Sequence, residues 1–179
     1  MRSLSSRKLD TEEELYAAAL RALMRRAHSV HEMRELLERR AEETSLVRPV
    51  LDRLKQHQYL DDARYAREFA RARAQSRRQG RYRIARELRA RGVPDRHIEA
   101  ALDEVFTETD EATLIRARLK RRLASLGGAA KELDENKLAS LYRSLLRAGF
   151  SSDAIRNELR ALTLLDPGDR EGAPRADED

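Results

Sequence analysis

Hydrophobic side chains recur along most of this 179-residue chain at the three- and four-residue spacing of a helix with one buried face. Three segments follow the full i, i+3, i+4, i+7 pattern: Val47, Val50, Leu51 and Leu54; Ile98, Ala101, Leu102 and Val105; and Leu138, Leu141, Tyr142 and Leu145. Six further stretches show the same spacing in part, at residues 16–27, 33–37, 65–72, 84–88, 115–123 and 155–162. The pattern therefore predicts nine amphipathic helices.

Residues between these stretches favour helix starts. Ser29 and Glu32 have the spacing of a capping box, in which each side chain accepts a hydrogen bond from the backbone N–H of the other residue. Further first turns are expected near Ser45, Asp61, Pro94, Asp134 and Ser151. Pro49 lacks a backbone N–H, so it must lie in the first turn of a helix that begins shortly after Ser45.

Helix ends repeat as well. A similar sequence pattern is expected to end a helix at residues 54–58, 88–92 and 145–149. The apolar residues that follow are Tyr59, Val93 and Phe150. Glycine, present at positions 92 and 149, favours the left-handed conformation that stops a helix, and the next apolar residue is expected to fold back onto that helix. Unit starts near residues 11, 60 and 110 are separated by 49 and 50 residues. The predicted helices therefore fall into three units of three.

The predicted fold is all-α, with three tandem three-helix repeats forming an elongated or curved molecule. A unit of about 50 residues buries little surface, so we expect neighbouring units to pack end to end and share a core. The expected parts are a flexible segment 1–10, a first repeat 11–59, a basic second repeat 60–109, a third repeat 110–165 and a disordered acidic tail 166–179. Residues 125–131, with Gly127 and Gly128, suggest a flexible joint. The alternative is a single compact helical bundle.

Composition narrows the class of protein. The chain is 39% charged and has only 7 glycines and 4 prolines, too few for the turns of an all-β protein of this size. No uncharged stretch approaches the ~20 apolar residues of a membrane helix, and residues 1–10 lack the apolar centre of a secretory signal, so we expect a cytoplasmic protein. Without cysteine, the chain can form neither a disulfide nor a thiolate metal site.

Positive charge is concentrated in the middle of the chain. Residues 64–91 hold eleven arginines and two glutamates, a local balance of +9 against +5 for the whole chain, so the rest is net −4. Helical spacing groups these side chains into two stripes, and the candidate binding residues are Arg64, Arg67, Arg71 and Arg78 on one helix and Tyr82, Arg86 and Arg89 on the next. Guanidinium groups bind two oxygens of a phosphate or carboxylate at once, which indicates a polyanionic partner. The alternative is an arginine-biased face that only contacts solvent.

Nucleic acid is the first polyanion to consider. The chain has no tryptophan, and its tyrosines fall mostly on apolar faces, so sequence-specific binding of single strands is not expected. Three-helix units also resemble helix-turn-helix modules, whose second helix enters the major groove. The arginines of residues 81–89 could contact DNA in this way, or they could bind an acidic protein. A DNA- or RNA-binding protein acting alone and an adaptor for an acidic protein therefore both stay open.

Catalysis finds little support in the sequence. His28, His31 and Glu32 have metal-like spacing, but they surround the Ser29 cap, where Glu32 already has a structural role. One residue of the Asp61 and Asp62 pair is more simply a helix cap than half of a catalytic carboxylate pair. No glycine-rich phosphate loop is present. We therefore expect an interaction protein with no catalytic residue, no cofactor, no metal and no membrane contact.

Four segments carry a family resemblance. They are residues 29–36 (SVHEMREL), 59–66 (YLDDARYA), 80–93 (GRYRIARELRARGV), and 137–138 (KL) with 147–151 (RAGFS). In order and spacing they resemble the motifs of the RecX family of recombinase regulators, over roughly residues 15–162. The chain departs from the family at Met33, usually leucine, at Gln58, usually glycine, and at residues 127–131, which do not align.

The resemblance implies three tandem three-helix repeats and a non-enzymatic role. RecX proteins bind the RecA recombinase, lodge in the helical groove of its filament on DNA, and restrain its ATPase and strand exchange. The leading hypothesis is that this chain bridges RecA protomers, with its central arginine surface facing filament acids or bound single- or double-stranded DNA. The motif residues expected to have structural roles are Ser29, Glu32, Tyr59, Leu60, Asp61, Asp62, Tyr65, Gly80, Ile84, Leu88, Gly92, Gly149 and Phe150.

Overall fold

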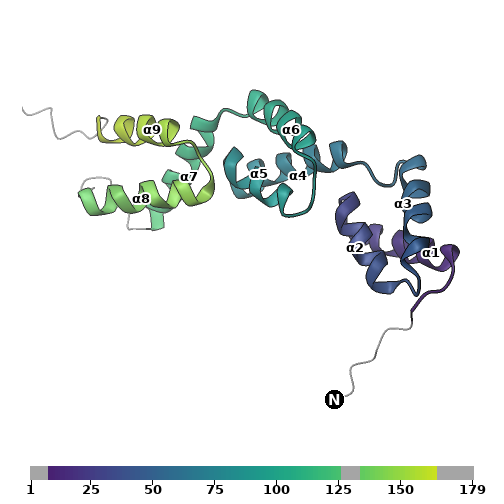
Figure 1. The fold of residues 1–179 in the computed structure, drawn as a ribbon. Coiled ribbons are helices and arrows are strands. Elements are labelled where there is room, and N and C mark those ends of the chain that lie inside the picture. Colours follow the sequence, from purple (N-terminus) through teal and green to yellow (C-terminus); the bar gives the residue numbers. More distant parts are fainter. Residues whose placement is uncertain (1–7, 126–133, 165–179) are drawn as a thin grey trace, which may run out of the picture.

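The computed structural model describes residues 8–125 and 134–164, and within them the chain is almost entirely helical. These two ranges contain nine α-helices and one 3₁₀ turn: α1 Glu12–Leu23, α2 Val30–Arg40, η1 Thr44–Leu46, α3 Val47–Gln56, α4 Asp62–Arg77, α5 Arg81–Arg89, α6 Asp95–Glu108, α7 Glu111–Ser125, α8 Glu135–Ala148 and α9 Ser152–Leu164. The helices form three groups of three in an elongated row (Figure 1). The all-α tandem fold is therefore confirmed, and the single compact bundle is wrong.

Polar caps begin most of these helices where the sequence predicts them. The Ser29 hydroxyl accepts a hydrogen bond from Glu32 N at 3.1 Å, and Ser29 N donates to Glu32 Oε2 at 3.2 Å, which completes the capping box of α2. Asp61 Oδ1 accepts from two backbone N–H groups at the start of α4. Ser45 is the exception, because its hydroxyl donates to Glu43 and the turn η1 leads into α3 without a side-chain cap.

Left-handed residues end α3, α5 and α8. Gln58, Gly92 and Gly149 have φ angles of +58°, +67° and +90°. The next residue donates back to the last turn in each case, and Phe150 N, for example, lies 3.3 Å from Leu145 O. The predicted backbone stop is thus present three times, once with glutamine.

Tyr59 does not follow the predicted packing. Its side chain is 51% exposed, whereas Val93 and Phe150 at the equivalent positions are buried. The following residue, Leu60, is buried instead and joins the core of the first unit. The expectation that the first apolar residue after the stop folds back is therefore wrong at this helix end.

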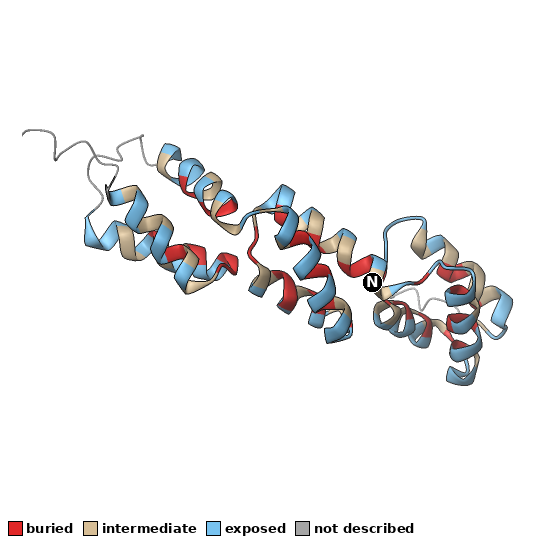
Figure 2. Cartoon of the chain, turned by 90° about the horizontal axis from the view of Figure 1, so that it is seen from above, coloured by how far each residue is buried: buried red, intermediate tan, exposed pale blue. Residues whose placement is uncertain are grey.

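Two separate hydrophobic cores hold the described part of the chain together, and the buried residues line the inner faces of the helices (Figure 2). The first core lies within α1–α3 and η1, and its largest fully buried side chains are Leu15, Met33, Leu37, Val50 and Leu54. The second is shared by α4–α9, with Ile84, Leu88, Ile98, Ile115, Leu145, Phe150 and Ile155. The expected shared core is thus found between the second and third units but not between the first and second.

The first and second units meet through polar groups. Ser29 Oγ donates to the carbonyl oxygen of Arg91 at 2.6 Å, and Val30 N donates to Asp62 Oδ1 at 2.9 Å. A Cβ atom added to Gly92 would overlap the ring of His31, so the α5–α6 turn lies tightly against α2. The motif residues Ser29, Asp62 and Gly92 therefore join two units whose apolar cores are independent.

The second and third units meet through main chain. Gly80 N donates to Ala148 O at 2.9 Å, and Tyr82 N donates to Gly149 O at 3.1 Å. These bonds satisfy N–H groups at the start of α5 with carbonyls at the end of α8. A Cβ atom at Gly80 would overlap the carbonyl of Gly149, so only glycine allows this approach.

The ends of the chain give one further correction. Leu9, in the segment predicted to be flexible, pairs with Ala41, since Leu9 N donates to Arg40 O and Glu42 N donates to Leu9 O, each at 2.8 Å. The predicted joint at Gly127 and Gly128 and the predicted acidic tail 166–179 lie outside the described residues. Among the described helices, none combines the length and apolar character needed to cross a membrane.

Candidate interaction surface

Most arginines of the basic middle segment contact acids of the same molecule. Of the eleven arginines between residues 64 and 91, seven form ion pairs. The pairs are Arg67 with Glu104, Arg71 with Glu104 and Glu108, Arg73 and Arg83 with Glu87, Arg81 with Asp103, Arg89 with Asp95, and Arg91 with Glu32. Five acids from outside the segment therefore reduce its local charge from +9 to +4.

The predicted stripe on α4 does not form one open basic surface. Arg71 Nη2 lies 3.2 Å from both Glu104 Oε1 and Glu108 Oε2 on α6. Arg64 Nη2 donates to the carbonyl of Gln58 at 3.0 Å, which holds it against the α3–α4 turn. Ala72, predicted to share the apolar face with Tyr65 and Phe69, is exposed. The buried alanines of α4 are Ala66, Ala70 and Ala74.

The stripe on α5 remains partly open. Arg89 Nε pairs with Asp95 at 2.7 Å, but within residues 8–125 and 134–164 Arg86 forms no ion pair. Tyr82 beside it is 63% exposed. The stripe therefore offers one aromatic ring and one unpaired guanidinium to a partner.

Two residues of α8 extend this open area. Leu146, 41% exposed, and Arg147 line a shallow hollow together with Tyr82 and Arg86. We call these four residues the junction surface, because α5 and α8 belong to different units. Exposed tyrosine, leucine and arginine side chains around a hollow resemble the centre of a protein-binding site, where aromatic and arginine residues contribute most of the affinity.

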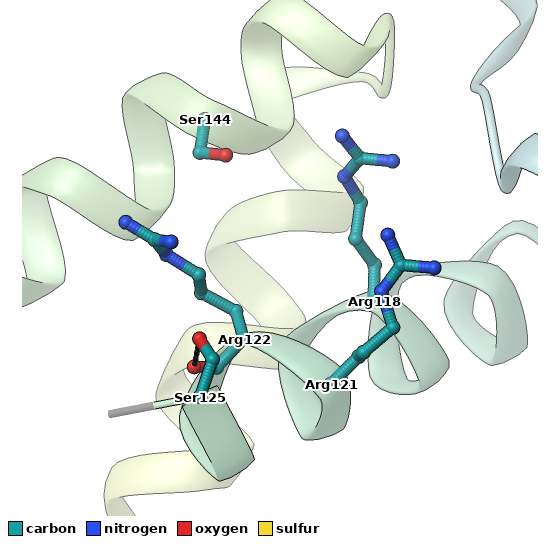
Figure 3. A pocket seen from close by; sticks show the side chains of 5 residues that line it. All are labelled: Arg118, Arg121, Arg122, Ser125 and Ser144. Carbon is teal, nitrogen blue, oxygen red and sulfur yellow. Dashed lines mark hydrogen bonds between the residues drawn. The ribbon is translucent and has the colours of Figure 1, made fainter. Parts of the chain in front are cut away.

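A second open basic area was missed by the sequence analysis. Arg118, Arg121 and Arg122 of α7 line a hollow together with Ser125 and with Ser144 of α8 (Figure 3). The signal was present in the sequence, since residues 116–122 (RARLKRR) hold five basic residues and no acid. It was overlooked because residues 64–91 carry a larger excess of arginine.

The motif residues at the first junction form a polar network rather than a reactive site. Glu32 accepts from Arg26 Nη1 at 2.9 Å and from the Tyr65 hydroxyl at 3.4 Å. Burial alone would raise the pKa of Glu32, but the hydrogen bonds from Arg26 and from the Ser29 backbone outweigh it and lower that pKa. Burial, together with the nearby charge of Arg26, lowers the pKa of His28. The groups that shift these two pKa values all belong to the first unit.

The metal-like spacing of His28, His31 and Glu32 does not bring these side chains together as a metal site within the described residues. The His31 ring lies against Gly92, and its Nε2 atom is 3.5 Å from Glu35 on the same helix. Across the part of the chain that the structure describes, no group of three histidine, cysteine or acidic side chains is placed to hold a metal ion. The chemistry available at the surface is recognition by guanidinium groups and exposed apolar side chains.

Comparison with known proteins places these features in one family. The model of the second three-helix domain of RecX matches residues 61–102. The regulatory protein RecX of Halorhodospira halophila is 38% identical over 144 residues, which cover 80% of this chain and 85% of that protein. That of Trichlorobacter lovleyi is 34% identical over 143 residues, covering 80% and 92%. The crystal structure of RecX from Lactobacillus salivarius has the same fold, with a TM-score of 0.74 and 23% identity over 86% of this chain and 97% of that one.

Proposed function

This chain belongs to the RecX family of regulatory proteins, and from that premise we propose that it binds the filament of the RecA recombinase and restrains its ATPase and strand exchange. The protein acts in the cytoplasm as a non-enzymatic regulator of homologous recombination and DNA repair. It exerts its effect by binding, with no active site of its own.

The junction surface is the observation that carries this proposal. Tyr82 and Leu146 expose apolar area on two helices of different units, and Arg86 and Arg147 flank them. Apolar side chains surrounded by arginine favour a protein partner with acidic groups around an apolar contact. We infer that this surface contacts the recombinase.

The elongated shape supports binding across several protomers of a filament. Three units follow one another in a row, so different units can contact successive protomers (Figure 1). A ligand that bridges protomers binds best to one filament geometry and shifts the population towards it. Such a ligand slows ATP turnover, or excludes a second DNA strand, without contacting a catalytic residue.

The test is the single-stranded-DNA-dependent ATPase of the cognate RecA, titrated with this protein at physiological salt. We expect inhibition well below one protein per recombinase protomer, and we expect excess DNA to leave it unchanged. Inhibition that disappears when DNA is added in excess would show that the protein merely competes for DNA, and the proposal would then be wrong.

The second candidate is a DNA- or RNA-binding protein that acts without a recombinase. Arg118, Arg121 and Arg122 of α7 favour it, because they form no ion pair within the described residues and offer several cations to one polyanion. This function predicts tight binding to bare nucleic acid with steep salt dependence, since each neutralised phosphate releases counterion. It also predicts that the ATPase of RecA is unaffected once free DNA is saturating.

A further inference from the structure

Among the described residues, those that line the hollow between α7 and α8 are arginines and serines. It has a volume of about 370 Å³ and is bordered by Arg118, Arg121, Arg122, Ser125 and Ser144. Figure 3 shows Arg118 and Arg121 on one side, Arg122 on the other, and Ser144 on the facing helix. Three guanidinium groups from two turns of one helix therefore surround one concave space.

Within the described residues, no acidic side chain pairs with the arginines of this hollow. Elsewhere on α7, Arg116 pairs with Asp110 at 3.4 Å and with Glu158 at 3.3 Å. In the ranges 8–125 and 134–164, by contrast, Arg118, Arg121 and Arg122 form no ion pair with an aspartate or glutamate. Burial lowers the pKa of Arg118, and the nearby positive charges of Arg121, Arg83 and Arg78 lower it further. An anion bound in the hollow would relieve this repulsion.

One wall of the hollow is fixed by main-chain contacts. Arg118 Nη1 donates to the carbonyl oxygen of Arg77 at 3.2 Å and lies 3.5 Å from that of Arg78. These carbonyls lie at the end of α4, where a cation is favourable. Arg118 is thus held in place, whereas Arg121 and Arg122 are exposed to solvent.

The chemistry of the lining distinguishes this site from the junction surface. The junction surface exposes Tyr82 and Leu146, whereas the described residues that line the α7 hollow include neither an aromatic nor an aliphatic side chain. Protein interfaces need such apolar anchors, whereas arginine and serine are the usual ligands of phosphate oxygens in a nucleic acid backbone. We propose that the α7 hollow binds backbone phosphates of a nucleic acid strand, without reading its sequence.

This site adds a DNA contact to the proposed function. It rests on that function only for the position of the bound strand. With the junction surface on the recombinase, the α7 hollow contacts a DNA strand carried by the same filament. Arg83 lies close to both areas. It lines the hollow of the junction surface, and its positive charge helps to lower the pKa of Arg118. One face of the second and third units thus has one area for protein and one for phosphate.

The experiment measures binding of the full chain to fluorescent oligothymidylate and to a duplex of equal length, without recombinase, over a range of salt concentrations. Arg121 and Arg122 are changed together to glutamine, which removes two charges at exposed positions. The matched control changes Arg21 and Arg34 to glutamine, two exposed arginines of the first unit that form no ion pair within the described ranges. A third variant, with lysine at 121 and 122, keeps the charge.

We expect the glutamine variant to bind oligothymidylate at least about tenfold more weakly and to lose about 1.4 from the slope of log affinity against log salt, because each lost phosphate contact removes about 0.7 for a single strand. The control and the lysine variant keep most of the affinity. A glutamine variant with the slope and affinity of the wild type would overturn the proposal. The comparison of strand and duplex shows which form of nucleic acid supplies the phosphates.

A failure of this inference can be told apart from a failure of the proposed function. The same glutamine variant is tested for binding to RecA in nuclease-treated solution, with polyglutamate as a non-phosphate polyanion. Loss of recombinase and polyglutamate binding with unchanged DNA binding would assign the hollow to an acidic protein surface and contradict the phosphate site. Loss of DNA binding alone supports the site, whether or not the wild type inhibits the ATPase.

Discussion

Asp62 Oδ1 accepts a hydrogen bond from the backbone N–H of Val30 at 2.9 Å, so the first residue of α4 caps the start of α2 in another unit. Its neighbour Asp61 caps α4 itself. The two adjacent aspartates therefore close two helix starts in two units. Their pairing explains why both carboxylates occur together in the motif at residues 59–66, where either one alone could cap only a single helix.

Replacing each aspartate by alanine should separate these roles. Both Asp61→Ala and Asp62→Ala lose a cap and should lower the free energy of unfolding by about 1 kcal/mol. Only Asp62→Ala should also loosen the first unit from the second, which small-angle scattering would detect as a broader distribution of long distances. Identical scattering from the two variants would show that Asp62 does not orient the first unit.

The junction surface predicts a loss of regulation without a loss of structure. Tyr82→Ser and Leu146→Ser, made separately, should each raise the concentration needed for half-inhibition of the RecA ATPase by about tenfold or more, since buried aromatic and apolar anchors dominate binding. The helical circular dichroism should not change, because both side chains are exposed. Met24→Ser, at an 86% exposed residue of the first unit, is the control. Equal inhibition by all three variants would remove this surface from the proposed contact.

Charge reversal should affect the two arginine stripes differently. Arg71→Glu places a third carboxylate beside Glu104 and Glu108, so it should lower the free energy of unfolding by about 1 kcal/mol. A compensating Glu108→Arg change should restore part of that loss. Arg86→Glu breaks no ion pair of the described residues and should weaken inhibition at unchanged stability. Urea denaturation of each variant, read beside the ATPase titration, tests this division, and a stable Arg71→Glu protein would contradict it.

The glycine at the second junction is sterically required. Gly80→Ala should lower the free energy of unfolding by about 3 kcal/mol, because the new methyl group meets the rigid carbonyl of Gly149. Gly92→Ala should cost somewhat less, since its methyl group meets the Cγ and Cβ atoms of the His31 side chain and no backbone carbonyl, although its φ of +67° adds strain. Denaturant titrations of both variants measure the difference. A larger loss from Gly92→Ala would mean that the α5–α8 backbone can separate easily.

Acid should destabilise the first junction in two stages. The pKa of His28 is lower in the folded protein than its ordinary 6.5, so its contribution to stability is complete above that value and is lost as pH falls through the folded pKa. The pKa of Glu32 is below its ordinary 4.5, so its contribution is lost only at still lower pH. Urea midpoints between pH 7.5 and 3.5 should show both declines in the wild type. The decline that begins near pH 6.5 should be absent in His28→Gln, and its persistence there would exclude this histidine as the cause.

Local sequence patterns predicted the local structure well. The capping box at Ser29, the cap at Asp61 and the stops at Gly92 and Gly149 each depend on residues within one or two turns, so spacing alone was enough to find them. The prediction that Tyr59 folds back onto its helix was wrong, because the position of the neighbouring core decides whether Tyr59 or Leu60 is buried. The predicted helix cap at Ser45 is absent, because the Ser45 hydroxyl donates a hydrogen bond to the nearby Glu43.

The interaction surface was less predictable because charge balance is a property of the fold. Arg67 and Arg71 of α4 pair with acids on α6, and Arg71 is 33 and 37 residues from its partners. Counting charge along the chain therefore marked residues 64–91 as open and basic. Leu146 and Arg147 lie elsewhere in the sequence and join Tyr82 and Arg86 only when α5 and α8 pack.

The separate cores of the first and second units have a mechanical consequence. Rotation at the Ser29–Arg91 and Val30–Asp62 contacts breaks a few hydrogen bonds that water can replace, and it brings no apolar core into solvent. The second and third units cannot turn in this way, because they share one core. Within the described residues, the second and third units therefore form a stiff rod that is joined to the first unit by a compliant hinge. A molecule of this kind can bind along a helical filament whose pitch varies, because the first unit can turn. The second and third units keep a constant length.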